Sequence, residues 1–132
     1  MQYEPTLDRA QLIELATKTY FGNVDAKKIE ATLDCFHDGA LFCVQTAFTR
    51  HAGKAEIRRM FEDFFAAYER IVHKDFVCTV DEKNGRITAS FEAVLTAADG
   101  RKTQLFNTNF WRIRDGRFQE VYVYFSGENV LV

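Results

Sequence analysis

Hydrophobic residues in the first half of the chain recur at the spacing of amphipathic helices. In the first segment, apolar side chains follow one another every three or four residues, with Asp8 as N-cap and Gln11 placed to close a capping box. Gly22 and Asn23 are expected to end that helix, and Asp25 to cap the next one. The third segment has an apolar face wide enough to cover a sheet. We expect helices over residues 8–21, 25–36 and 54–70.

The second half has the alternating pattern of strands joined by hairpins. Runs rich in Val, Phe, Thr and Tyr are separated by the turn signals Asn84-Gly85, Asp99-Gly100 and Asp115-Gly116. We expect the strands of this meander over residues 72–82, 87–97, 102–113 and 117–125. A turn at residues 37–39 and a short strand over residues 40–44 are expected before the third helix. Helices followed by a meander predict one α+β domain over residues 1–132.

The turns also predict which strand residues share a face. We take Asn84-Gly85 as a two-residue turn and both Asp-Gly pairs as type I turns with glycine in a bulge. The face toward the helices is then apolar except for two asparagines, which is typical of a small-molecule pocket. It comprises Phe76, Cys78, Val80, Ile87, Ala89, Phe91, Ala93, Leu105, Asn107, Asn109, Trp111, Val121, Val123 and Phe125. A two-residue type I′ turn at Asp115-Gly116 would instead point Glu120, Tyr122 and Tyr124 inward.

The opposite face carries an aromatic patch that would be unusual on a monomer. Its members are Phe106, Phe110, Phe118, Tyr122 and Tyr124. Because interfaces favour aromatic residues, we expect a second copy of the chain to cover this face, in a homodimer.

Composition narrows the classes of function. The chain has 132 residues, with 17 Lys and Arg against 19 Asp and Glu, so 17 − 19 = −2 and the basic excess of a nucleic-acid binder is missing. No apolar run is long enough to span a membrane, and no leader pattern is expected at the start. Three cysteines in apolar stretches are expected to be buried and reduced, which indicates the cytoplasm. No motif predicts a metal ion or another cofactor.

Four short motifs accompany this order of elements: Cys-Phe-His-Asp-Gly-Ala (35–40), Arg-His-Ala-Gly-Lys-Ala-Glu-Ile-Arg (50–58), Gly-Arg-Lys-Thr (100–103) and Phe-Trp-Arg-Ile-Arg-Asp-Gly-Arg (110–117). Over nearly its whole length the chain resembles the nuclear transport factor 2-like superfamily, and within it the SnoaL-like polyketide cyclases and ketosteroid isomerases. The resemblance implies a conical barrel of curved antiparallel sheet with three helices on its concave face. It also implies a pocket at the open end and frequent homodimerisation.

The functional residues of the ketosteroid isomerases carry over only in part. There, an Asp on the first strand moves the proton, while a Tyr and a protonated Asp bind the oxyanion. The position of the base falls on Val44, which carries no proton, so the steroid isomerase mechanism is not expected. The oxyanion Asp falls on Asn109, whose amide can still donate a hydrogen bond, and the Tyr position lies near Thr17 to Tyr20. SnoaL-like cyclases would place an acid or base where Val121 and Val123 are expected to face inward.

Two functions stay open. The first is an isomerase, lyase or cyclase acting on a small hydrophobic carbonyl compound, with Asn109 and Tyr20 stabilising an enolate and Asp38 or His51 accepting the proton. The second is a non-catalytic ligand-binding or dimerisation module, which the lack of an inward ionisable side chain favours. The expected ligand-binding residues are Val44, Phe64, Phe91, Asn107, Trp111, Val123 and His51.

Each candidate also has a purely structural interpretation. Asn107 and Asn109 could bond each other, and Tyr20 could be an ordinary core residue. His51 could be a surface residue, and His73, at the start of a strand, is expected to face solvent.

Overall fold

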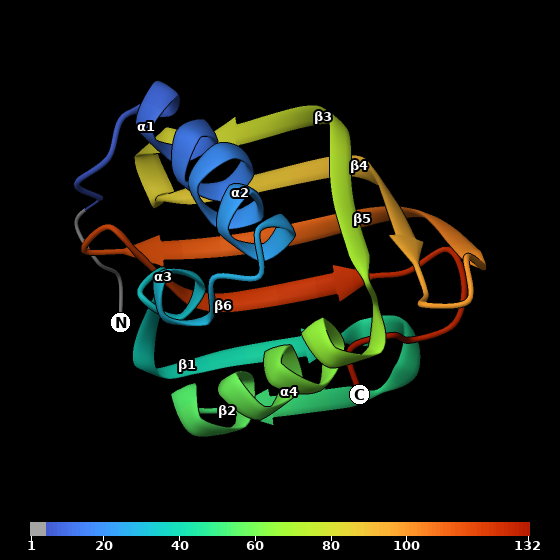
Figure 1. Cartoon of the computed structure of the whole chain (residues 1–132). Coiled ribbons are helices and arrows are strands. Elements are labelled where there is room, and N and C mark those ends of the chain that lie inside the picture. The colour runs from blue at the N-terminus through green and yellow to red at the C-terminus, as the bar shows by residue number, and fades with distance from the viewer. Residues whose placement is uncertain (1–4) are drawn as a thin grey trace.

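Six strands form one curved sheet, and the helices pack on one of its faces (Figure 1). The computed structural model describes residues 5–132, so the first four residues of the predicted domain lie outside the described part. The helical segments are α1 (Arg9–Ile13), η1 (Glu14–Thr19), α2 (Tyr20–Asp25), α3 (Ile29–Leu33), η2 (Gln45–Ala47), α4 (Lys54–Ala67) and η3 (Glu82–Asn84). The strands are β1 (Phe36–Val44), β2 (Thr49–Ala52), β3 (Arg70–Asp81), β4 (Arg86–Thr96), β5 (Lys102–Arg114) and β6 (Arg117–Tyr124).

The order of strands in the sheet is β2-β1-β6-β5-β4-β3, and the sheet does not close between β2 and β3. Strands β3 to β6 form the predicted antiparallel meander, while β1 pairs with β6 in parallel. The predicted α+β fold is therefore confirmed, with a mixed sheet in place of a wholly antiparallel one. The turn expected at residues 37–39 is wrong: these residues belong to β1, where its pairing with β6 is irregular.

The first helical run is longer than predicted. Its start is confirmed, since Asp8 Oδ1 accepts from the Gln11 backbone and Gln11 Oε1 accepts from the Asp8 backbone. The end expected at Gly22 is wrong, because α1, η1 and α2 continue without a break to Asp25. Burial of residues on both sides of Gly22 outweighs the roughly 1 kcal/mol that a helical glycine costs. The predicted second helix is correspondingly short, and Asp25 ends α2 instead of capping α3.

The last hairpin combines both turn alternatives. Asp115 and Gly116 have φ angles of 51° and 73°, which is the two-residue type I′ geometry and not the predicted bulged type I turn. A bulge then lies within β6, because Phe118 pairs with Ile113 while Glu120 pairs with Arg112. Beyond the bulge, the inward orientation predicted for Val121 and Val123 is confirmed. Before the bulge, the outward orientation predicted for Phe118 is wrong, since this ring is fully buried.

The β3–β4 connection is a four-residue loop and not the predicted two-residue turn. Asp81 pairs with Arg86, which shifts the register by two residues and leaves Cys78, Val80 and Ile87 on their predicted face. Gly85 closes the loop at φ 64°, where a Cβ atom would lie 2.8 Å from the carbonyl oxygen of Ile113. Glycine is required here by both its conformation and the close approach of β5.

Aromatic rings fill much of the space between helices and sheet. The largest fully buried side chains include Trp111, Phe36, Phe42, Phe61 and Phe118. Figure 1 shows α1, α2, α3 and α4 covering one face of the sheet, with the C-terminus beside α4. In the described part of the chain, no helix has the length and apolar character needed to cross a bilayer.

Candidate functional site

A small cavity of about 30 Å³ lies between the helices and the sheet. Apolar side chains form most of its wall, and the polar exceptions are Tyr20, His73, Asn107 and Asn109. The remaining lining residues are Phe21, Val24, Phe42, Phe61, Phe64, Phe91, Ala93, Leu95, Leu105, Val123, Phe125, Val130 and Leu131. None of these described lining residues is Lys, Arg, Asp or Glu, so the cavity suits an uncharged group.

Tyr20 enters the cavity from the helical side. It begins α2, directly after the π-helical turn η1, a type of irregularity that is frequent at functional sites. Its ring packs edge-on against Phe36, Phe61 and Phe118, at centroid distances of 5.1–6.2 Å. Burial raises the pKa of Tyr20 well above 10, with smaller contributions from Cys35 and Asp25. The hydroxyl is therefore neutral at ordinary pH, and a neutral hydroxyl can donate to a ligand oxygen.

Asn107 and Asn109 reach the cavity from β5. Both are buried, at 5% and 3% exposed, and they do not bond each other: Asn107 Oδ1 accepts from the Ser126 backbone at 3.4 Å. Asn109 Oδ1 has no hydrogen-bond partner among residues 5–132. A buried amide oxygen without a partner is costly, and it is available to accept a hydrogen bond from a ligand or a bound water.

The expectation that His73 faces solvent is wrong. Its side chain is 8% exposed and lies in the cavity wall, stacked on Phe21 at a centroid distance of 4.3 Å. The reason is a bulge in β3 between Lys74 and Val77, with Asp75 at φ 60°. Strand alternation reverses across this bulge, so His73 pairs with Ala93 and shares its inward face.

Asp25 fixes the orientation of this histidine. Its Oδ1 lies 2.6 Å from His73 Nδ1, and its Oδ2 accepts from the His73 backbone at 2.8 Å. An acidic residue at the C-terminal end of a helix opposes the helix dipole, so the two hydrogen bonds compensate an unfavourable position. A carboxylate at Nδ1 favours the tautomer with the proton on that nitrogen and leaves the lone pair on Nε2. No hydrogen bond occupies Nε2 within residues 5–132.

The sequence carries no strong signal for this pair. The two residues are 48 positions apart, and neither belongs to the motifs quoted above. Only the β3 bulge brings the imidazole inward, and the position of a bulge is not encoded by an alternating pattern. The sequence pattern predicted no ionisable side chain on the inward face, and in the structure His73 is one.

Six of the ten candidate residues line the cavity: Tyr20, Phe64, Phe91, Asn107, Asn109 and Val123. Asp38 does not, because its side chain is 97% exposed and lies 3.5 Å from Lys54. Val44 is buried in the core, and Trp111 lies behind Tyr20 at a ring distance of 6.3 Å. His51 is not a lining residue: it is buried, at 3% exposed, and not on the surface, and its Nε2 is 3.0 Å from the carbonyl oxygen of Leu131.

The family model for the SnoaL-like domain matches residues 17–121, which include β1 to β5 and the polar cavity residues. The chain belongs to the SnoaL-like domain family. The predicted resemblance to the nuclear transport factor 2-like superfamily is thereby confirmed. No curated protein matches this SnoaL-like chain.

Solved structures share the fold of this SnoaL-like chain at low sequence identity. A "putative aromatic ring hydroxylase" from Novosphingobium aromaticivorans is 25% identical, covers 92% of this chain and 90% of its own, and has a TM-score of 0.76. A "putative polyketide cyclase" from Xanthomonas campestris is 20% identical, covers 88% of this chain and 90% of its own, and has a TM-score of 0.75. SalBIII, an epoxide hydrolase/cyclase-like enzyme in pyran ring formation, is 14% identical, covers 90% of this chain and 93% of its own, and has a TM-score of 0.78.

Proposed function

We propose that the protein is an acid–base catalyst of the isomerase or cyclase kind, acting on a small uncharged carbonyl compound. The observation that carries the proposal is the hydrogen bond of 2.6 Å between Asp25 and a histidine of the cavity wall. A histidine held by a carboxylate is a recurrent general base, because one nitrogen is fixed and the other is free to accept a proton. SnoaL-like neighbours named as cyclases support the same class of reaction.

The proposed step is a proton transfer within one substrate. His73 Nε2 takes a proton from the carbon beside the carbonyl, and the electron pair left behind forms an enolate. Tyr20 and Asn109 donate hydrogen bonds to the enolate oxygen. His73 then returns the proton to another carbon, which gives an isomer. In a cyclase, the enolate carbon attacks a second carbonyl of the same molecule, and His73 protonates the new alkoxide.

The charges around the site support an uncharged substrate. Among residues 5–132, the cavity lining contains no carboxylate and no Lys or Arg to balance an anionic ligand, and the Asp25 carboxylate contacts His73 from outside the lining. Aromatic walls such as Phe21 and Phe91 favour a flat ring. A neutral cyclic ketone therefore fits the chemistry of the site better than a carboxylate or a phosphate.

Exchange of α-protons for deuterium tests the base without knowledge of the natural substrate. We expect the protein to accelerate exchange of 1-tetralone in D₂O, followed by proton NMR. His73→Gln should lower the protein-dependent rate roughly 100-fold or more, which is the usual contribution of a general base. Asp25→Asn should lower it by a smaller factor, because the imidazole stays in place but loses its fixed tautomer.

The matched control is Asp38→Asn, which removes an exposed carboxylate outside the cavity and should leave the rate unchanged. Equal rates for the wild type and His73→Gln would refute the proposed role of the histidine.

The size of the cavity favours a second candidate, a ligand-binding or dimerisation module without catalysis. A space of about 30 Å³ holds about one water molecule, whereas ligand pockets have roughly 300–1,000 Å³. This module would bind 1-tetralone, or leave it unbound, without exchanging its protons in any variant.

We also propose a homodimer through the outer face of the sheet. Phe106, Phe110 and Tyr124 are 61%, 45% and 42% exposed. Phe110 and Tyr124 also line a groove of about 570 Å³ on this face. Phe110→Arg should convert a sedimenting dimer to monomer, while Phe48→Arg, in the β1–β2 loop, should not. A monomeric wild type at micromolar concentration would contradict this.

The three cysteines support a reducing compartment, the cytoplasm, as the location of the protein. All three are free; Cys35 and Cys43 are buried as predicted, but the burial predicted for Cys78 is wrong, since it is only partly buried. Burial raises the pKa of the Cys35 thiol to about 11, which keeps it protonated and unreactive.

A further inference from the structure

The segment that follows β6 closes the cavity. Val130 and Leu131 contribute directly to the cavity wall, together with Phe125. Both are partly buried against the core, yet residues 125–132 form no helix or strand. The space beneath them is about one tenth of the smallest ordinary ligand pocket. A cyclic ketone can therefore bind here only if part of the cavity wall moves away.

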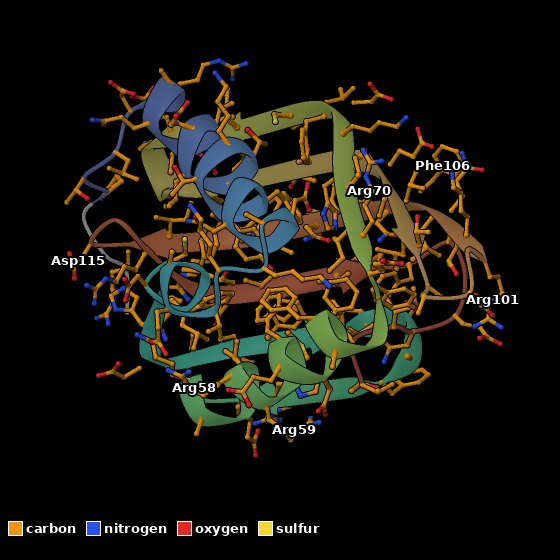
Figure 2. The ribbon with its side chains drawn as sticks, viewed as in Figure 1. Arg58, Arg59, Arg70, Arg101, Phe106 and Asp115 are labelled. Atoms are coloured by element: carbon orange, nitrogen blue, oxygen red, sulfur yellow. The ribbon has the colours of Figure 1, made fainter. Side chains whose placement is uncertain are left out.

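Residues 125–132, which we call the strap, are held by a few polar contacts. The carbonyl of Leu131 is 3.0 Å from His51 Nε2, and the carbonyl of Val132 accepts from Arg59 on α4, labelled in Figure 2. The Asn129 amide donates to Thr49 Oγ1 at 3.2 Å. These contacts all lie beyond Glu128, so they fix the far end of the strap to β2 and α4.

The near end of the strap has the features of a hinge. Ser126, Gly127 and Glu128 are exposed, and a Cβ atom on Gly127 would lie 2.9 Å from Leu105 Cδ2 in the cavity wall. The Ser126 backbone donates to Asn107 Oδ1, and its hydroxyl accepts from the Phe106 backbone. A short exposed segment without regular structure opens at lower cost than a strand, so the strap can move while β6 stays paired.

We infer that Val130 and Leu131 occupy the outer part of the ligand site, and that the strap swings out when an uncharged aromatic ketone binds. The inference takes the class of ligand from the proposed function, but it does not require that the protein be catalytic. The strap competes with the ligand for the same apolar surface, so the closed state lowers the apparent affinity. Variants that weaken the seating of Leu131 should therefore bind the ligand more tightly than the wild type.

The test compares two neighbouring substitutions to the same residue. Leu131→Asp places a charge in the cavity wall and should release the strap, whereas Val132→Asp adds the same charge at a side chain that is 63% exposed and outside the wall. With 1-tetralone as probe and titration calorimetry as readout, we expect Leu131→Asp to bind about tenfold more tightly. Val132→Asp should match the wild type. Neither position lies in a helix or strand, so both variants should fold.

Hydrogen exchange gives a second readout. Binding of 1-tetralone to the wild type should increase amide exchange in residues 126–132. Equal affinities for the two Asp variants, no binding to any of the three proteins, or slower exchange in the strap on binding would each overturn the inference. Failure of the proposed catalysis is distinguishable, because it appears as probe binding without α-proton exchange in any variant.

Discussion

Replacement of Asn109 by leucine separates the requirements of stability from those of function. The residue is 3% exposed, and its Oδ1 has no partner among residues 5–132, so folding removes it from water without compensation. An unsatisfied buried polar group costs about 1–3 kcal/mol, and leucine has a similar size without polar atoms. We therefore expect Asn109→Leu to raise the free energy of unfolding by about 1–3 kcal/mol.

The shift in melting temperature follows from the length of the chain. Unfolding entropy near 60 °C is roughly 2.1 cal/mol/K per residue, or about 280 cal/mol/K for 132 residues. A gain of about 1–3 kcal/mol thus corresponds to a rise of roughly 4–11 °C in Tm. Differential scanning calorimetry measures this rise, and α-proton exchange of 1-tetralone should fall in the same variant because an oxyanion donor is lost.

Asn107→Leu is the matched control, on the same strand and the same face. Its carbonyl accepts from the Ser126 backbone, so the substitution leaves that N–H without its partner and should lower Tm. A lower Tm for Asn109→Leu than for the wild type would refute the reasoning, since it would mean that the amide is satisfied.

Two further predictions concern stability away from the site. Gly85→Ala should lower the free energy of unfolding by about 1 kcal/mol or more, because φ is +64° and the new Cβ would lie 2.8 Å from the Ile113 oxygen. Urea unfolding measures this loss. Gly39→Ala is the control, because a Cβ atom there meets open space and φ is not positive. Stability should also fall above pH 9, since the pKa of Cys35 is about 11 in the folded state and 9 when unfolded. The unfolded state therefore loses the proton first. Urea unfolding at pH 8 and pH 10 should show a smaller loss for Cys35→Ala than for the wild type.

Much of the fold could be predicted because the apolar pattern and the Asn-Gly and Asp-Gly turns depend on local chemistry. The inward face of β4 and β5 follows from alternation alone, which is why Asn107 and Asn109 were identified as cavity residues. The β6 bulge shows the limit of this reasoning. The extra residue between Phe118 and Glu120 reverses the alternation. The orientation predicted for Phe118 is therefore wrong, while those predicted for Val121 and Val123 are correct.

The candidate site depends on a second reversal of this kind. The bulge in β3 turns His73 inward, and the helix that runs past Gly22 delivers Asp25 to meet it. Both events go against local preference: a glycine inside a helix and an acidic residue at a helix end are each unfavourable by propensity. Tertiary contacts decide them, and pattern analysis of single segments does not contain those contacts.

The tautomer of His73 tests the central claim most directly. With ¹⁵N-labelled imidazole, NMR should show a proton on Nδ1, next to Asp25, and a bare Nε2 whose signal moves when 1-tetralone is added. A proton on Nε2 in the neutral state, or an Nε2 signal that stays fixed while the ketone binds, would contradict the role of His73 as the base.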